Sequence, residues 1–271
     1  MLCALVWYGC TKQVSTSGTA QNSGGQKSAR RAEVLFLGHN SKHHDANKYA
    51  PWLATALFQD GINLTYTVDL KDLNPENLRK YDGLLIYANH DQLAPEQEKA
   101  MQDFVEGGRG LIPLHSASGC FKNADWYIQT IGGQFKSHGE GTFTADIVKE
   151  KHPVMQGLTE FATWDETYVH QNLNKDMTVL MERVEGSTRE PYTWVRNQGK
   201  GRVFYTAYGH NDSTWTNAGF LKLVRNGVKW AIGDQVMQQV ANLNIPHVDI
   251  YASSGIHISD FTKRSEEPKV Q

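Results

Sequence analysis

The first half of the chain repeats one pattern, in which a short continuous apolar run ends in glycine or a polar loop and an amphipathic stretch follows. Continuous apolar runs are typical of strands buried on both faces of a parallel sheet. Apolar residues that return every three or four positions indicate the connecting helices. The pattern predicts a doubly wound, mainly parallel α/β sheet flanked by helices. The expected elements are strands at 34–38, 62–68, 83–88 and 110–115 and helices at 47–59, 75–81 and 95–105.

The second half alternates apolar and polar residues and is rich in β-branched and aromatic side chains. Polar turns separate these stretches, as is typical of antiparallel strands. We therefore expect antiparallel strands in the C-terminal half of the sheet. The expected elements are a helix at 120–131, strands at 141–148, 163–170, 178–184, 192–196 and 202–208, and a helix at 218–232.

Length and composition favour one folded domain at residues 33–234. A chain of 271 residues with 39% apolar residues can bury one substantial core. We expect residues 235–271 to form an irregular tail, because the stretch beyond Asn242 is rich in Pro, Ser and charge and has no periodicity. The net charge of −2 gives no basic surface for phosphates, so nucleic acid is not an expected partner.

The beginning of the chain indicates export. Residues 1–10 are apolar and end in Gly9 and Cys10, and residues 11–32 form a polar linker rich in Ser, Gly and Gln. This arrangement resembles a bacterial lipoprotein signal with Cys10 as the lipidated residue. The apolar stretch is too short to span a bilayer, so membrane attachment is expected only through the lipid. The alternative is a disordered N-terminus on a cytoplasmic protein.

Imidazoles and carboxylates follow or begin several of the predicted strands. Open α/β sheets bind their ligands at the carboxyl ends of strands, so we expect these side chains to converge on one crevice. Together they suit either a divalent metal, Zn²⁺ first among the candidates, or general acid–base catalysis. The residues concerned are His44, His115, His138, Asp165, Glu166 and His210.

Each candidate is given a role as a hypothesis. The catalytic residues are His115, Asp165 and Glu166, and the metal ligands are His115, His138 and His210. The substrate-binding residues are His44, Ser116, Trp164 and Tyr168. Other readings stay open, because His115 could only cap its strand and His210 could only serve a turn. Since side chains alternate along a strand, only one of Asp165 and Glu166 can face the crevice, and the other could bond loop amides.

Five short motifs, taken in order, resemble the ThuA-like family. They lie at residues 108–117, 132–138, 152–154, 165–168 and 201–210, and the resemblance covers about residues 33–234. The resemblance implies a flavodoxin-like fold of the class I glutamine amidotransferase-like superfamily and a link to trehalose and related sugars. It also implies frequent secretion and fusion to other modules among bacterial relatives, so the tail could lead to a further domain.

The resemblance further implies what the chain does not do. Amidotransferases of this fold carry a cysteine nucleophile on a strained turn, at the position that His115 occupies here. Cys120 comes five residues later, inside the predicted helix, where a free cysteine is typically a small buried hydrophobe. Ser116 and His115 are neighbours that point to opposite faces, so adjacency alone does not make them a catalytic pair. The chain is therefore not expected to be a glutamine amidotransferase.

The expected activity is hydrolysis or elimination on a carbohydrate or an oxidised (keto) sugar, assisted by a divalent metal or by acid–base residues. A small-molecule carbohydrate is the expected partner. The main alternative is a non-catalytic sugar-binding module that serves a partner enzyme or a fused domain. A third alternative is a surface scaffold without a ligand.

Overall fold

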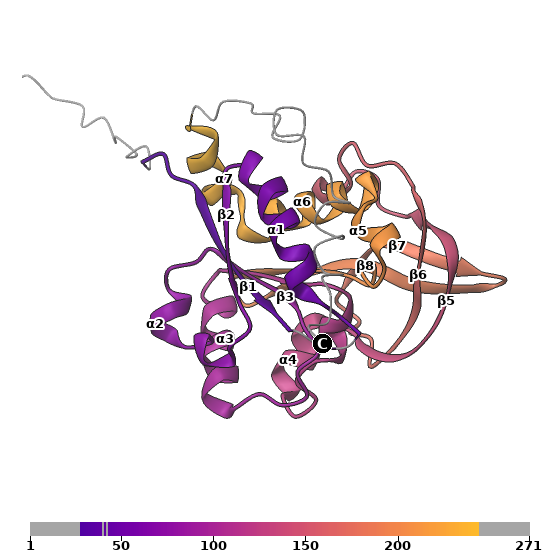
Figure 1. The fold of residues 1–271 in the computed structure, drawn as a ribbon, viewed down its shortest axis with the longest axis horizontal. Coiled ribbons are helices and arrows are strands. Elements are labelled where there is room, and N and C mark those ends of the chain that lie inside the picture. Colours follow the sequence, from indigo (N-terminus) through magenta and orange to yellow (C-terminus); the bar gives the residue numbers. More distant parts are fainter. Residues whose placement is uncertain (1–27, 40, 42, 244–271) are drawn as a thin grey trace, which may run out of the picture.

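The computed structural model describes residues 28–39, 41 and 43–243. Nine strands form one sheet in the order β2-β1-β3-β4-β9-β8-β7-β5-β6 (Figure 1). The predicted signal, linker start and lipidation residue Cys10 lie outside the described residues. Within the described ranges, no helix is both long enough and apolar enough to cross a membrane.

The first five positions of the sheet are parallel and confirm the predicted doubly wound architecture. Their order, β2-β1-β3-β4-β9, is the flavodoxin-like order, with the reversal between β1 and β3. Nearly all of β1, β3 and β4 is buried, as their continuous apolar runs predict. The bounds are β1 Ala32–Gly38, β2 Ile62–Thr67, β3 Gly83–Tyr87, β4 Gly110–Pro113 and β9 Gly201–Thr206.

Helices cover both faces of this parallel part (Figure 1). One face carries α1 (Ala46–Gln59), α6 (Ala218–Ile232) and α7 (Asp234–Ala241), and the other carries α2 (Pro75–Leu78), α3 (Pro95–Glu106) and α4 (Asp125–Ile131). The short helix α5 covers Asp212–Trp215, and 3-10 turns cover Leu70–Asp72, His115–Gly119 and Pro153–Met155.

The remaining strands are antiparallel, as predicted for the second half of the chain. They are β5 Gln134–Ile147, β6 Ala162–Gln171, β7 Thr178–Glu185 and β8 Thr188–Gln198. This end of the sheet curls over itself, so that the Tyr192 hydroxyl on β8 donates a hydrogen bond to the Glu166 carbonyl on β6, although β7 and β5 lie between these strands in the sheet order. The curl brings β6, the last strand in the order, toward the carboxyl ends of the parallel strands.

Several predicted boundaries are wrong. The strand expected at 110–115 ends at Pro113, so that His115 lies in the 3-10 turn that follows, and the helix expected at 75–81 ends at Leu78. The helix expected at 120–131 begins only at Asp125, because residues 120–123 instead bond to the loop after β3: Phe121 donates to the carbonyl of His90, and Asn123 pairs with the backbone of Leu93. Cys120 therefore lies before the helix and not in it. The strand expected at 141–148 begins at Gln134, and the expected irregular tail opens with the helix α7.

Candidate functional site

Four side chains from separate parts of the chain meet at the carboxyl ends of the parallel strands. His44 comes from the loop after β1, His115 from the turn after β4 and His210 from the loop after β9, while Glu166 reaches in from β6. One ligand atom from each residue lies within 4.8 Å of every other. We call these four residues the His/Glu cluster. It is the convergence predicted for strand-end histidines, and it lies where open α/β sheets bind ligands.

The contacts inside the cluster are short. Nε2 of His115 lies 3.3 Å from Oε2 of Glu166, and Nδ1 of His210 lies 3.2 Å from Oε1 of the same carboxylate. Nδ1 of His210 also lies 3.4 Å from Nε2 of His44. A tetrahedral zinc ion with bonds of about 2.0–2.1 Å holds its ligand atoms about 3.3 Å apart. The three contacts are near this spacing, and the remaining pairs of ligand atoms lie within 4.8 Å of one another.

The backbone around His115 fixes its ring. His115 has φ of +46°, in the left-handed region, and the Tyr205 hydroxyl donates to its carbonyl over 3.1 Å. Nδ1 of His115 lies 2.7 Å from the carbonyl of Ala207, which requires that this nitrogen carries the proton. The other ring nitrogen, Nε2, points toward the cluster and lies 3.3 Å from Oε2 of Glu166. This ring nitrogen is buried and has no hydrogen-bond partner among the described residues, as expected of an atom that awaits a ligand.

Asp165, the neighbour of Glu166, is fully buried and holds the loop that carries His210. Its Oδ1 accepts hydrogen bonds from the backbone amides of Glu166, His210 and Asn211. Its Oδ2 accepts from the amide of Gly209 and the hydroxyl of Thr214. Glu166 therefore faces the crevice, and Asp165 bonds loop amides, which is one of the alternatives that strand alternation leaves open. The structure places Asp165 in a positioning role and not among the converging groups.

The pKa values of the side chains in the cluster favour the binding of a cation. Burial and the neighbouring imidazoles His115 and His210 lower the pKa of His44 to about 3. Burial also lowers the pKa of His210, although Glu166 acts in the opposite direction. Burial by itself raises the pKa of Glu166, but the contact with His115 and the charges of the other imidazoles outweigh it and lower the pKa to about 2. At neutral pH, His44 and His210 are neutral and Glu166 is an anion, which are the forms that ligate metals.

A small pocket of about 230 Å³ opens beside the cluster. Phe135 and Tyr168 form an aromatic wall with ring centroids 4.6 Å apart, and Tyr168 stacks on His115. The hydroxyl of Ser116 lines the pocket, is buried and has no hydrogen-bond partner among the described residues. Asn89 lies at the same pocket. The pocket thus offers one aromatic surface and two buried polar atoms without a hydrogen-bond partner among the described residues, Oγ of Ser116 and Nδ1 of His44.

The structure brings most of the predicted site residues together and leaves some outside the His/Glu cluster and the pocket. His44, Ser116, Glu166 and Tyr168 line the pocket, and His115 and His210 complete the cluster beside it. His138 lines the pocket too, but it is exposed on β5 and stands outside the His/Glu cluster, with Nδ1 3.6 Å from Oε1 of Glu166. Trp164 is half-buried and is not among the residues that line the pocket.

Sequence reasoning did not single out Asn89, His43, Gly119 or Phe135, which also line the pocket. Asn89 follows β3 directly, so the rule that ligands bind at strand ends could have identified it. Phe135 carries no such signal, because the first part of β5 is polar and does not alternate as a strand does.

Comparisons with known proteins agree with this fold. The family model described as ThuA, trehalose utilisation, matches residues 33–231. A ThuA-like protein from Bacteroides uniformis ATCC 8492 superposes with a TM-score of 0.65 at 21% identity, covering 77% of this chain and 96% of that one. A ThuA-like protein from Parabacteroides merdae ATCC 43184 gives a TM-score of 0.63 at 16% identity, covering 75% and 90%.

A third solved structure, described as a cytoplasmic protein from Salmonella typhimurium, gives a TM-score of 0.53 at 14% identity and covers 73% of this chain and 98% of that one. At these identities the structures establish a common fold. A search of curated protein sequences found no match.

Proposed function

The chain belongs to the ThuA family, and from that premise we propose that it acts on a carbohydrate or an oxidised (keto) sugar by metal-assisted hydrolysis or elimination. One observation carries the proposal. His44, His115, Glu166 and His210 bring their ligand atoms within 4.8 Å of one another beside a pocket of about 230 Å³.

The donor set fits a divalent metal of the zinc type. Three imidazoles and one carboxylate are ligands that zinc accepts, and His115 is held by the backbone carbonyl of Ala207 in the tautomer that offers Nε2. A divalent metal bound there would polarise a carbonyl or lower the pKa of water. Ligation would also give the buried, unpartnered Nε2 of His115 a bonding partner.

His138 is the residue best placed to move a proton. It lies at the mouth of the pocket, is exposed, and contacts Glu166 without belonging to the His/Glu cluster. An imidazole in that position can exchange protons with solvent and with a bound hydroxyl group. The metal role given to His138 from the sequence therefore moves to His44 and Glu166, and His138 takes the acid–base role.

The pocket favours a single sugar ring. Its volume of about 230 Å³ is below the range of about 300–1,000 Å³ that is usual for drug-sized ligands. Phe135 and Tyr168 offer an aromatic surface to the apolar face of a ring, and Ser116 and Asn89 offer hydrogen bonds to hydroxyl groups.

Metal content tests the proposal. Purified wild-type protein should carry close to one equivalent of a divalent metal, and His210→Ala should lose most of it. His138→Ala should keep it, because His138 is outside the cluster. His152→Ala is the matched control, since His152 packs against Trp230 away from the site. Full metal retention in His210→Ala would refute the metal site.

Turnover separates an enzyme from a binding module. The protein should convert at least one member of a panel of disaccharides and their keto derivatives, detected by mass, and His138→Ala should slow this reaction while it retains metal. Binding of a sugar without any mass change would favour the non-catalytic module.

We also propose that Cys10 carries a lipid and attaches the protein to a bacterial membrane from the exported side. When cells that express the full chain are fractionated with detergent, the wild-type protein should be found in the membrane fraction. Cys10→Ala should release the protein from that fraction. Equal partitioning of the two forms would favour the cytoplasmic alternative.

A further inference from the structure

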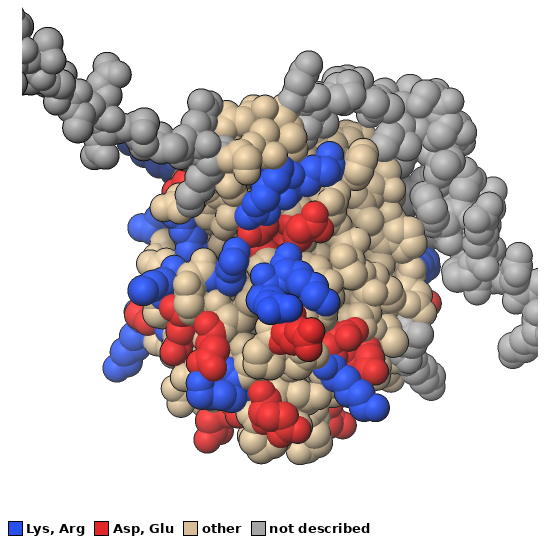
Figure 2. Space-filling model, turned by 90° about the vertical axis from the view of Figure 1, so that its left-hand side faces the viewer, with Lys and Arg blue, Asp and Glu red and all other residues tan. Residues whose placement is uncertain are grey.

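A second cavity lies at the opposite end of the sheet from the His/Glu cluster. It occupies about 760 Å³ and is lined where β4 and β9 begin, at the junction of α6 with α7 and by Arg30 just before β1. Figure 2 presents the side of the molecule on which β1 begins, and Lys and Arg side chains gather near its centre with acidic side chains beside them.

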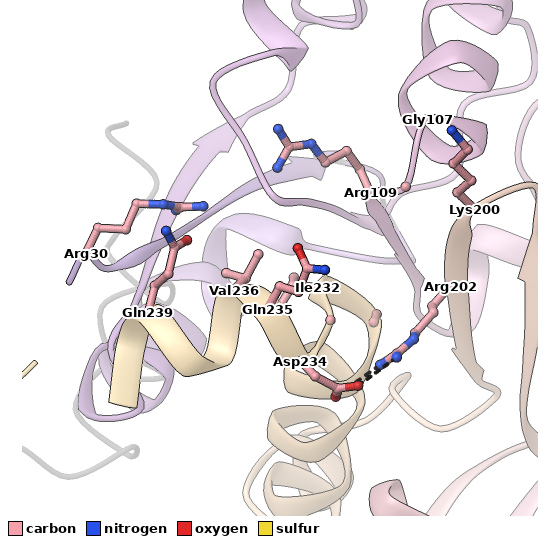
Figure 3. A pocket seen from close by; sticks show the side chains of 13 residues that line it. Arg30, Gly107, Arg109, Lys200, Arg202, Ile232, Asp234, Gln235, Val236 and Gln239 are labelled. Atoms are coloured by element: carbon pink, nitrogen blue, oxygen red, sulfur yellow. Dashed lines mark hydrogen bonds and ion pairs between the residues drawn. The ribbon is translucent and has the colours of Figure 1, made fainter. Parts of the chain in front are cut away.

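Four cationic side chains from separate segments border this cavity (Figure 3). Arg30 precedes β1, Arg109 precedes β4, Lys200 lies in the turn between β8 and β9, and Arg202 lies on β9. We call this cavity, with its four cationic residues, the basic cavity. A whole chain of net charge −2 thus concentrates cations at one hollow.

The acidic partners leave part of this charge uncompensated. Arg30 and Arg109 share the single buried carboxylate of Asp82, at 2.7 Å each. Arg202 pairs with Asp234 at 2.9 Å, and Lys200 has no ion-pair partner within the described ranges. Asp82 and Asp234 pair with three of the four cations, and Glu33 adds a negative charge near Arg30, so the basic cavity keeps a net positive charge that suits an anion.

The same ion pairs hold the guanidinium groups in place. Asp82 accepts two hydrogen bonds from Arg30 and one from Nη1 of Arg109, and Figure 3 shows the two guanidinium groups extending toward each other. Guanidinium groups fixed in this way suit the oxygens of a phosphate, which they bind through paired hydrogen bonds. The glycines Gly107 and Gly108 leave the neighbouring wall without side chains.

We propose that the basic cavity binds a phosphate group, carried either by a small soluble ester or by a phospholipid headgroup. The volume exceeds that of a bare anion and leaves room for the organic part of an ester. This inference is independent of the proposed function, because no residue of the basic cavity belongs to the His/Glu cluster or its pocket.

The test uses the purified chain and two kinds of probe. Calorimetric titration with inorganic phosphate and with glycerol phosphate measures the binding of soluble phosphates. Sedimentation with vesicles of phosphatidylcholine, with and without phosphatidic acid, measures the headgroup source. Loss of one charged hydrogen bond should weaken binding by about ten- to a hundredfold in Arg109→Gln and in Lys200→Gln. Lys200→Gln removes no ion pair and should fold normally.

Arg189→Gln is the matched control, because it makes the same change in charge at an exposed position on β8, where Arg189 pairs with Glu182. Binding of soluble phosphates that falls in both cavity variants and persists in Arg189→Gln supports the proposal with a soluble ligand. Binding only to vesicles with phosphatidic acid, with the same dependence, supports the headgroup. No binding to any probe, or an equal loss in Arg189→Gln, overturns the proposal.

Discussion

Replacing Asp165 by asparagine should both destabilise the protein and weaken metal binding, because this carboxylate holds the loop that carries His210. Asp165 is fully buried and accepts five hydrogen bonds, four from backbone amides and one from Thr214. Asparagine has the same shape but only one acceptor oxygen and no charge. The substitution therefore changes hydrogen bonding without opening a cavity.

The magnitude follows from these contacts. In the better orientation, the new amide nitrogen faces the N–H of Gly209, so one buried donor loses its partner, at a cost of about 1–3 kcal/mol. The bonds kept by the remaining oxygen weaken from the charged range of about 1.5–3 kcal/mol to the neutral range of about 0.5–1.5 kcal/mol. Because the contributions of bonds to one group do not add in full, these changes together should lower the free energy of unfolding by about 3–5 kcal/mol.

Urea unfolding followed by tryptophan fluorescence measures this loss, and Asp103→Asn is the control. Asp103 is an exposed carboxylate paired with the equally exposed Lys99, so its replacement should cost less than about 1 kcal/mol. Metal affinity of Asp165→Asn should also fall by about 10–100-fold, as for other groups that orient a ligand. A loss of stability in Asp165→Asn no larger than in Asp103→Asn would show that other contacts hold the loop.

Three further outcomes are expected. Gly209→Ala should destabilise the protein more than Gly186→Ala. Gly209 has φ of +136°, and a Cβ atom added there would lie 3.2 Å from Cβ of His115. Gly186 has φ of +60° and no atom near its added Cβ, so Gly186→Ala should lower the free energy of unfolding in urea by only about 1–2 kcal/mol. Metal-free protein should lose stability between pH 7 and pH 5, because the pKa of His44 is about 3 in the folded protein and its ordinary value in the unfolded chain is higher, so that only the unfolded chain gains a proton in this range. His44→Gln should reduce this loss of stability by up to about 2 kcal/mol. Equal dependence of stability on pH in the wild type and His44→Gln would contradict this expectation. Burial raises the pKa of the Cys120 thiol to about 12, so iodoacetamide should modify Cys120 only in urea, as read by peptide mass, and modification of the folded protein would contradict its burial.

The hydrophobic pattern predicted the fold well where burial dictates the sequence. Strands buried on both faces must be apolar throughout, so β1, β3 and β4 were readable, and the stripe and glycine stop of α6 gave its bounds. The first part of β5 was not readable, because residues 136–140 are exposed and carry no apolar alternation. Their strand conformation comes from pairing with β6, a long-range contact that leaves no local signal.

The candidate site was predictable as a place and as a set of residue types, but the roles within it were not. Strand ends pointed to His115 and His210, whereas the division between Asp165 and Glu166 depends on how β6 curls against β8. His44 sits in a loop without periodicity, and only the fold brings it within 3.4 Å of His210. Which histidines join the His/Glu cluster and which one stays at the mouth of the pocket depends on distances in the fold, and the spacing of residues along the chain does not encode these distances.

The strained turn after β4 explains how one backbone can support this cluster. His115 has a positive φ, and histidine is one of the few residues besides glycine and Asn or Asp that enter this region with some frequency. The turn aims the ring at the point where the loops after β1 and β9 meet, and the Ala207 carbonyl fixes its tautomer. Gly209 lies close to Cβ of His115, and its amide donates a hydrogen bond to Asp165. These contacts help to hold the strained backbone of His115 in place. The geometry of the His/Glu cluster therefore depends on this network of backbone contacts around its four side chains.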